Sequence, residues 1–410
     1  MNNGIISLLK VPGFKVLDVQ IWGEEITISV RKRSKTARCP CCLKRTKRLK
    51  DYRPPSRILH MMLCNQRVYL SLRKRRFYCS SCKKVFTEKL SFLSARSRKS
   101  AYAKCHALER LSDSSFKITS QRVGISYGSL VTLLKKVFSQ DTIKWSEQIT
   151  KGVIRLGIDE HHFGRKNKYL VTIANLLTGK PIHILPNDQK KTLVSFLKTL
   201  PNQVKERIEE VAVDMKTSFI RAIEETLPKA RIVIDHFHII QDANRRVNDA
   251  RKIEDDVQEK IKGNGPKRIP WRLLTRNKEN LKGKQTELVD YYLRQFPAVS
   301  IFYACKEKLR DMYKAETKQE AEQILVSLIR FMRESEYPEL YLWANTLKRH
   351  EPYILNYFDN HTTNAVTEGL HRKFKLIQRQ AFGFRNPEVY IRRVMLAFLP
   401  LTLLRLYPHY

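Results

Sequence analysis

The chain has 410 residues, with 78 Lys plus Arg against 40 Asp plus Glu, a formal net charge of +38. An excess of this size is too large for an ordinary solvated surface and indicates a polyanionic partner, for which nucleic acid is the best fit. The sequence contains neither a run of ~18 apolar residues, as a transmembrane helix requires, nor a signal-peptide pattern. We therefore expect a soluble, intracellular protein of two to four domains that binds nucleic acid and has no membrane partner.

The basic charge is concentrated in residues 1–100, which hold 25 Lys or Arg and only 5 Asp or Glu. Residues 1–95 also contain two CxxC pairs with 36 residues between them. In a basic chain without a secretory signal, paired CxxC motifs favour a tetrahedral Zn²⁺ site over disulfides. The alternative is four buried or free thiols, and Cys41 would compete with Cys42 as a ligand. We interpret residues 1–95 as a zinc-binding, DNA-binding domain with the ligands Cys39, Cys42, Cys79 and Cys82.

Residues 96–148 are typical of a helix-turn-helix. Two helices are predicted, at 116–123 and 127–137, on either side of a turn at Gly124. Ser126 is a good N-cap for the second helix, which carries an apolar stripe. In a helix-turn-helix this second helix would enter the major groove of DNA. The alternative is an ordinary helical hairpin.

Residues 149–245 predict the first part of an α/β catalytic core. In chain order we expect strands at 153–158, 169–175 and 181–185, a helix at 191–199, a strand at 211–213, a helix at 217–226 and a strand at 231–234. Three successive strands followed by alternating helices and strands form the ribonuclease-H-like layout. In that layout the first and fourth strands lie side by side. Asp159 and Asp214, which follow those two strands, would then meet.

A third acid, Glu368, lies 154 residues after Asp214 on a predicted helix. Two carboxylates at strand ends and a third from a helix suit two divalent cations, because hard cations such as Mg²⁺ take oxygen ligands. Taken singly, each aspartate is more often a cap or a turn residue, and Glu368 would pair with Arg372 one turn later.

The gap before Glu368 is too long for a simple connection. Residues 246–355 are charged and have helical periodicity, and we predict that they form an all-α insertion. Trp271 and Trp343 are expected in its core, with stacking on an extruded base as the alternative. Residues 356–410 would supply the closing helices of the catalytic core. The predicted fold is a multidomain α/β protein, in which a ribonuclease-H-like core with an all-α insertion follows a zinc-binding domain and a helix-turn-helix.

Together these features resemble the DDE transposases of the ISL-three family of bacterial insertion sequences. The resemblance covers nearly the whole chain. It rests on the CxxC pairs and on the segments 157–160, 213–216, 235–238, 363–379 and 383–386. His371 departs from the pattern, because many relatives are expected to have Asn at this position.

The resemblance implies that Asp159, Asp214 and Glu368 bind Mg²⁺ (or Mn²⁺). His238 belongs to an Asp-x-x-His signature, and it would orient a carboxylate or approach the scissile phosphate; the alternative is a histidine that caps a helix.

The implied partner is double-stranded DNA, both the terminal inverted repeats of the element and the target. The implied reaction is metal-dependent cleavage and strand transfer by a homo-oligomer, in the bacterial cytoplasm at the nucleoid. The alternatives are a non-catalytic DNA-binding regulator derived from a transposase and a ribonuclease-H-fold nuclease without strand transfer.

Overall fold

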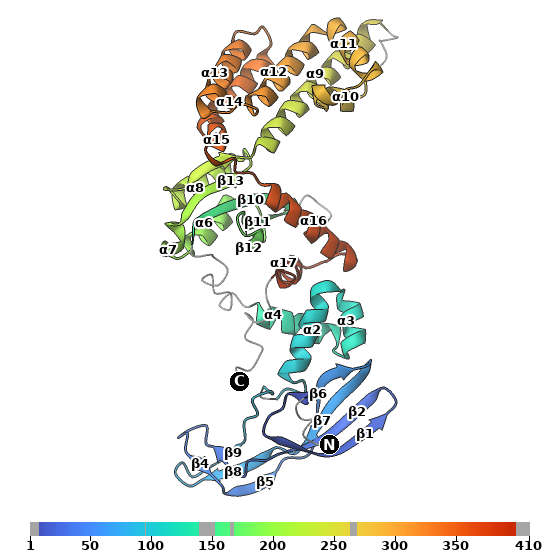
Figure 1. Cartoon of the computed structure of the whole chain (residues 1–410), viewed down its shortest axis with the longest axis vertical. Helices are drawn as coiled ribbons and strands as arrows, with labels where there is room; N and C mark the ends of the chain where they lie inside the picture. The colour runs from blue at the N-terminus through green and yellow to red at the C-terminus, as the bar shows by residue number, and fades with distance from the viewer. Residues whose placement is uncertain (1–7, 95, 139–151, 165–167, 263–268, 399–410) are drawn as a thin grey trace. The chain divides into compact units, whose positions relative to one another are not determined.

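A computed structural model describes residues 8–94, 96–138, 152–164, 168–262 and 269–398. The chain divides into two compact units, each described here by itself. The first comprises Met1–Trp145 and Lys373–Tyr410, and the second comprises Ser146–Arg372. The division falls within helix α16 (Ala365–Gln380), so the segment 356–410 is shared between the two units. Figure 1 shows the elements and their labels.

The first unit begins with a four-stranded sheet in the order β1-β2-β7-β6. Its strands are β1 (Phe14–Trp22), β2 (Glu25–Lys32), β6 (Ser56–Leu63) and β7 (Gln66–Leu72). The pairs β1/β2 and β6/β7 are antiparallel hairpins, and the central pair β2/β7 is parallel. Alternate residues of β2 and β7 are buried, because side chains point to opposite faces of a strand and one face of this sheet covers a core.

A second group of short strands carries the cysteines. Strands β3 (Ala37–Arg38) and β4 (Arg45–Thr46) form one hairpin, and β5 (Leu49–Tyr52), β8 (Arg75–Cys79) and β9 (Lys84–Thr87) form a three-stranded sheet. The guanidinium of Arg75 donates to both carboxylate oxygens of Glu88, at 3.0 and 2.6 Å, and both residues are buried. A bidentate pair of this kind satisfies both charges away from water.

Three helices follow: α2 (Ala101–Asp113), α3 (Phe116–Val123) and α4 (Tyr127–Val137). Each begins at a serine whose side chain accepts from a backbone N–H of the first turn: Ser100, Ser115 and Ser126. Gly124 ends α3 at φ 65°, a left-handed conformation that glycine adopts without steric cost. Helices α3 and α4 therefore occupy the two ranges predicted from the sequence. Helix α17 (Pro387–Leu396) packs against α2 and α4.

The second unit contains a five-stranded sheet in the order β12-β11-β10-β13-β14. Its strands are β10 (Ile154–His162), β11 (Tyr169–Asn175), β12 (Lys180–Leu185), β13 (Ile208–Val213) and β14 (Arg231–Ile234). The first three are antiparallel neighbours, whereas β13 and β14 run parallel to β10. The first and fourth strands of this sheet are adjacent, as the sequence predicts.

One prediction about β10 is wrong. The sequence predicts that the strand ends at residue 158, but it continues to His162. Its antiparallel pairing with β11 runs on to the pair His162↔Tyr169, and the side chain of His161 is buried. Asp159 therefore lies within a strand, where its backbone is held on both sides of the residue.

Helices complete the second unit. Helices α6 (Lys190–Lys198), α7 (Asn202–Lys205) and α8 (Thr217–Thr226) lie between the strands in sequence, and α9 (His236–Lys262) follows β14. The described part of residues 246–355 is helical, as predicted. It contains the end of α9, α10 (Trp271–Thr275), the short 3-10 helix η2 (Lys278–Asn280), α11 (Lys284–Gln295), α12 (Pro297–Met312), α13 (Lys318–Arg333) and α14 (Pro338–Leu355).

The two tryptophans of the helical segment differ. Trp343 is fully buried and stacks on Phe302, as predicted for a core residue. Trp271 is 49% exposed, so the prediction that it belongs to the core is wrong. It is the first residue of the five-residue helix α10, whose buried residue is Leu274. Among the described residues, no helix is both long and apolar enough to cross a membrane.

Candidate functional site

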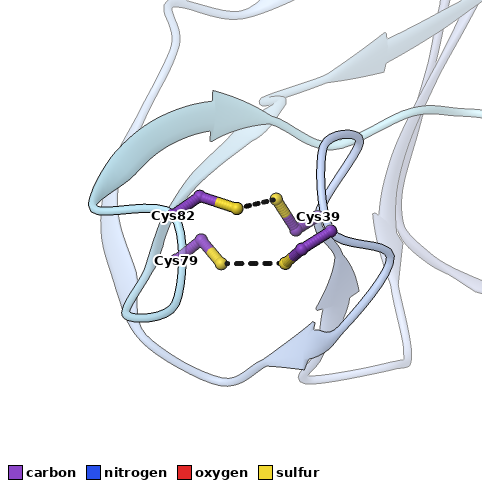
Figure 2. Close-up of side chains that lie close together, drawn as sticks. Cys39, Cys79 and Cys82 are labelled. Atoms are coloured by element: carbon purple, nitrogen blue, oxygen red, sulfur yellow. Dashed lines mark hydrogen bonds between the residues drawn. The ribbon is translucent and has the colours of Figure 1, made fainter.

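The four predicted zinc ligands lie together at the turns of two knuckles. Within the described residues, Cys39, Cys42, Cys79 and Cys82 form a group whose sulfur atoms all lie within 4.8 Å of one another. The sulfurs of Cys39 and Cys82 are 4.0 Å apart, and those of Cys42 and Cys79 are 3.5 Å apart. Figure 2 shows Cys39, Cys79 and Cys82 pointing toward one another. Four sulfurs at 2.3 Å from a tetrahedral Zn²⁺ would be about 3.8 Å apart, so the group fits this ion.

The backbone explains why these cysteines and not Cys41 converge. The residue after each knuckle's second cysteine, Leu43 or Lys83, has a positive φ, of 60° and 52° respectively. In the first knuckle the N–H of Leu43 donates to the carbonyl of Cys39 at 3.0 Å, which closes a tight turn. That turn directs Cys42 inward and leaves Cys41 exposed. The cluster of sulfurs therefore includes Cys42, and Cys41 is exposed.

The thiols also influence one another's ionisation. The backbone N–H groups of Cys42 and Cys41 lower the pKa of Cys39 to about 7, and neighbouring thiols add to this. Hydrogen bonding to the sulfur of Cys42, together with burial, raises the pKa of Cys82. Four thiols this close cannot all ionise without a cation between them, and Zn²⁺ would supply that charge.

In the second unit, Asp159 is the best-fixed of the three predicted acids. It is buried on β10, and one carboxylate oxygen accepts from the N–H of Glu160 at 2.7 Å. Burial raises the pKa of Asp159, His238 and the Glu160 N–H lower it, and the charges of Asp214 and Glu368 raise it; together these effects bring the pKa to about 6. Asp159 therefore lies within electrostatic reach of both other acids.

Asp214 directly follows β13, the parallel neighbour of β10. Its carboxylate accepts from the N–H of Met215 at 2.5 Å and faces His238, whose Nδ1 lies 3.6 Å away. The other ring nitrogen of His238, Nε2, is buried without a hydrogen-bond partner among the described residues. His238 sits in the first turn of α9 and contacts a carboxylate, so its contact with Asp214 goes beyond a helix cap.

Glu368 is carried by the first turn of α16, which packs closely on β10. The contact point is Gly157, two residues before Asp159. A Cβ at Gly157 would lie 2.5 Å from Thr367 Oγ1 and 2.7 Å from Asn364 Oδ1. The amide of Asn364 donates to the carbonyl of Ile158 at 3.4 Å. Because residue 157 has no side chain, the start of α16 can approach β10 and bring Glu368 toward Asp159.

A buried carboxylate fixes the chain where it returns from the helical segment. Glu210 of β13 is fully buried and accepts from Asn360 Nδ2 at 2.6 Å and from the hydroxyl of Thr362. Arg231 also donates to it, at 3.1 Å. Glu210 thus ties the residues just before α16 to the sheet. Sequence reasoning missed it, because an acid within an apolar strand gives no periodic signal.

His371 supports Asp159 from α16. Its Nδ1 lies 3.6 Å from Asp159 Oδ2, and its Nε2 lies 3.0 Å from the hydroxyl of Thr172. That hydroxyl is also 3.1 Å from Nδ1 of His161. His371 therefore lies against the carboxylate of Asp159.

A lysine missed in the sequence also borders the site. Lys216, two residues after Asp214, pairs with Glu160 and with Asp188, whose Oδ2 lies 2.6 Å from its Nζ. It links the loop after β12 to β10 and to the start of α8. The segment Val213–Lys216 stands out in the sequence, but it gives no indication of the partners of Lys216, which are distant along the chain.

The three acids lie near one another, but they do not form one group that could bind a single ion. In the described part of the chain, the cysteine cluster is the one group of three or more possible ligands close enough to share an ion. A two-metal site does not require three acids around one ion, because its ions are about 3.5–4 Å apart and divide the ligands between them. A buried aspartate flanked by two further acids fits such a pair of hard cations.

Comparison with known proteins gives a family match in each of the two regions that hold these residues. Residues 156–394 match the DDE transposase family of ISL3 type, described as "Transposase". Residues 35–82 match the zinc finger of transposases IS204/IS1001/IS1096/IS1165.

Individual relatives have related names. The chain is 23% identical over 383 residues to the transposase for insertion sequence element IS1001 of Bordetella parapertussis, which covers 92% of both chains. It is 26% identical over 264 residues, 59% of both chains, to the transposase for insertion sequence element IS1557 of Mycobacterium tuberculosis.

Proposed function

The chain belongs to the ISL3 family of DDE transposases, and from this premise we propose that it cleaves and joins DNA at the ends of an insertion sequence. Family membership makes it a nucleic-acid-processing enzyme. The proposal adds a ribonuclease-H-like core, a metal site at Asp159, Asp214 and Glu368, and strand transfer. The observation that carries it is the approach of these three acids from β10, β13 and the start of α16.

The residues would divide the work as follows. Asp159, Asp214 and Glu368 would hold the metal ions. Asp159 itself is held by the Glu160 N–H and by His371. Mg²⁺ or Mn²⁺ ions, when bound, supply activation of the attacking oxygen and stabilisation of the leaving oxygen. His238 would hold Asp214 in place, and its Nε2, which is buried and has no hydrogen-bond partner among the described residues, would be available to a phosphate oxygen.

The proposed reaction has two steps. Water attacks a phosphorus atom at the element end, the bond from phosphorus to the 3′-oxygen breaks, and a free 3′-hydroxyl and a 5′-phosphate result. That 3′-hydroxyl then attacks a phosphorus atom of target DNA and displaces the target's own 3′-oxygen. Neither step needs a covalent protein–DNA bond.

DNA recognition is assigned to the first unit. Its zinc-binding segment lies in the residues that hold 25 of the 78 basic side chains, and α3 and α4 form the proposed helix-turn-helix. Together they would bind the terminal inverted repeats. We further propose that the active form is a homo-oligomer on paired ends, acting on DNA in the bacterial cytoplasm.

The test compares wild-type protein with Asp159→Asn, Asp214→Asn and Glu368→Gln on a duplex of the terminal repeat, with Mg²⁺ or Mn²⁺. Each variant should bind the duplex normally and lose 3′-end release and joining. The loss should be roughly 10³-fold, because a missing metal ligand costs several kcal/mol of transition-state stabilisation. Glu334→Gln, at an exposed helix end, is the matched control.

The outcomes separate the rival functions. If a variant joins strands at the normal rate, the substituted residue is not part of the catalytic site. Wild-type protein that binds the repeats without cutting them is a regulator. Protein that cuts but never joins pre-cleaved ends is a nuclease.

A further inference from the structure

The turn between α16 and α17 presents an aromatic side chain that has no packing role. Phe382 is 91% exposed, the largest exposed fraction among the large apolar side chains described. Two residues later, Phe384 packs against the rings of Phe116 and Tyr390, with centroids 6.5 and 5.3 Å away. Of two neighbouring phenylalanines, one anchors the turn and the other points into solvent.

The backbone holds Phe382 in a conformation that phenylalanine disfavours. Its φ is 56°, in the left-handed region where a helix usually ends with glycine. The N–H of Phe382 donates to the carbonyl of Arg379 at 2.9 Å, and the next N–H, from Gly383, donates to Gln378 at 2.8 Å. This cap would form more easily with glycine at 382, so the fold does not need phenylalanine there.

The turn is fixed to the helices of the proposed DNA-binding segment. Phe384 contacts Phe116 of α3, and Phe116 contacts Tyr127, the first residue of α4, with centroids 5.3 Å apart. On the other side of the turn, Glu388 of α17 lies 3.4 Å from Nζ of Lys135 in α4. All these residues belong to the first unit. The turn that carries Phe382 is therefore attached to both helices of the proposed helix-turn-helix.

The charge around Phe382 suits the same ligand. Arg379 and Arg385 flank it in sequence and are exposed, as is Lys375 on α16. An aromatic ring among cations is the usual platform for a nucleobase, because the cations hold the phosphates while the ring stacks on the base. Apolar side chains inserted at a base step also open the duplex there.

We propose that Phe382 is a nucleobase-stacking residue that captures a base unstacked near the element end. The inference rests on the proposed function, since it requires DNA on the α3–α4 surface. Its ligand is a single base exposed by local opening of the duplex. Stacking on Phe382 should not depend on which base this is, because every base offers a flat face.

Full-length protein is tested with two kinds of end duplex. One is fully paired, and the other carries one unpaired adenine, placed at each successive position near the end. Wild-type protein should prefer one or a few of the bulged duplexes by roughly 5- to 150-fold, the range for one base stacked on an aromatic side chain.

The informative variant is Phe382→Gly. It relieves the left-handed backbone, so its melting temperature should equal or exceed that of the wild type, whereas its preference for the bulge should disappear. Phe382→Trp should retain the preference. Phe331→Ala, which removes a half-exposed aromatic ring from α13, should leave it unchanged.

The result that overturns the inference is a wild-type preference that persists in Phe382→Gly, or a wild-type protein that binds the paired end and gains nothing from any bulge. Wild-type protein that does not distinguish the paired end from unrelated DNA contradicts the proposed function instead.

Discussion

Replacing Gly157 with alanine tests how the third acid reaches the site. A Cβ at this position would lie 2.5 Å from Thr367 Oγ1, 2.6 Å from Leu176 Cδ2 and 2.7 Å from Asn364 Oδ1. An ordinary contact begins at 3.4 Å, so the start of α16 must retreat from β10 by about 0.9 Å. Thr367 and Asn364 are fully buried, which leaves them little freedom to rotate away.

Two effects of different size should follow. Overpacking of this kind destabilises a fold by about 1–3 kcal/mol, so the protein should still fold. A displacement near 1 Å at a catalytic group costs on the order of 10²-fold in rate. We therefore expect Gly157→Ala to lower cleavage and joining by roughly 10²-fold while binding to the end duplex stays close to that of the wild type.

The assay pairs denaturant unfolding with single-turnover cleavage of an end duplex in Mg²⁺. Gly369→Ala is the matched control. Gly369 lies in α16, the helix that Gly157→Ala should displace; it is exposed, and a Cβ added there has no atom within 4 Å. It should stabilise α16 by about 0.5–1 kcal/mol. If Gly157→Ala cleaves at the wild-type rate, the close approach of α16 is not what places Glu368.

Three further outcomes are expected. The pKa of Asp159 is raised to about 6 from 3.8, so without metal its contribution to folding stability is present below pH 3.8 and is lost as pH rises to about 6. The affinity for Mg²⁺ should increase as pH rises from 3.8 to about 6, because the ion competes with a proton for the Asp159 carboxylate. Calorimetric titration checks this, and Asp159→Asn should show no such increase. Purified protein should contain one Zn²⁺, which Cys79→Ser should lose together with amide protection in residues 8–94; zinc-free protein with native-like protection would contradict this assignment. With roughly 6–10 phosphate contacts, affinity for the end duplex should fall by about 10³–10⁵ between 50 and 200 mM salt, and a shallow salt dependence would show that phosphate neutralisation is not the main term.

The sequence predicted the elements with strong local signals. The knuckle cysteines, the Ser126 cap and the order of strands around Asp159 follow from local patterns in the sequence, and the structure agrees with each. The adjacency of β10 and β13 was also predictable, since a parallel pair requires a crossover, which the intervening helices provide.

What the sequence did not predict depends on distant partners. β10 extends past Asp159 because β11 continues to pair with it, and His161 is buried by contact with Thr172 and His371. No local pattern announces such a contact across 210 residues. The exposure of Trp271 has the same origin, because burial depends on what packs against a short helix and not on the residue type.

The parallel pair at the centre of the first sheet has a consequence for synthesis of the protein. Glu25 of β2 pairs with Arg67 of β7, and Cys39 shares its metal site with Cys79 and Cys82. The β2/β7 pair can form only after about the first seventy residues have left the ribosome, and the metal site only after Cys82 has followed, although β1 and β2 emerge much earlier. The apolar face of the early hairpin is therefore uncovered at first, and parallel pairings of this span close slowly. Zinc can join the two knuckles only once the second knuckle has been synthesised.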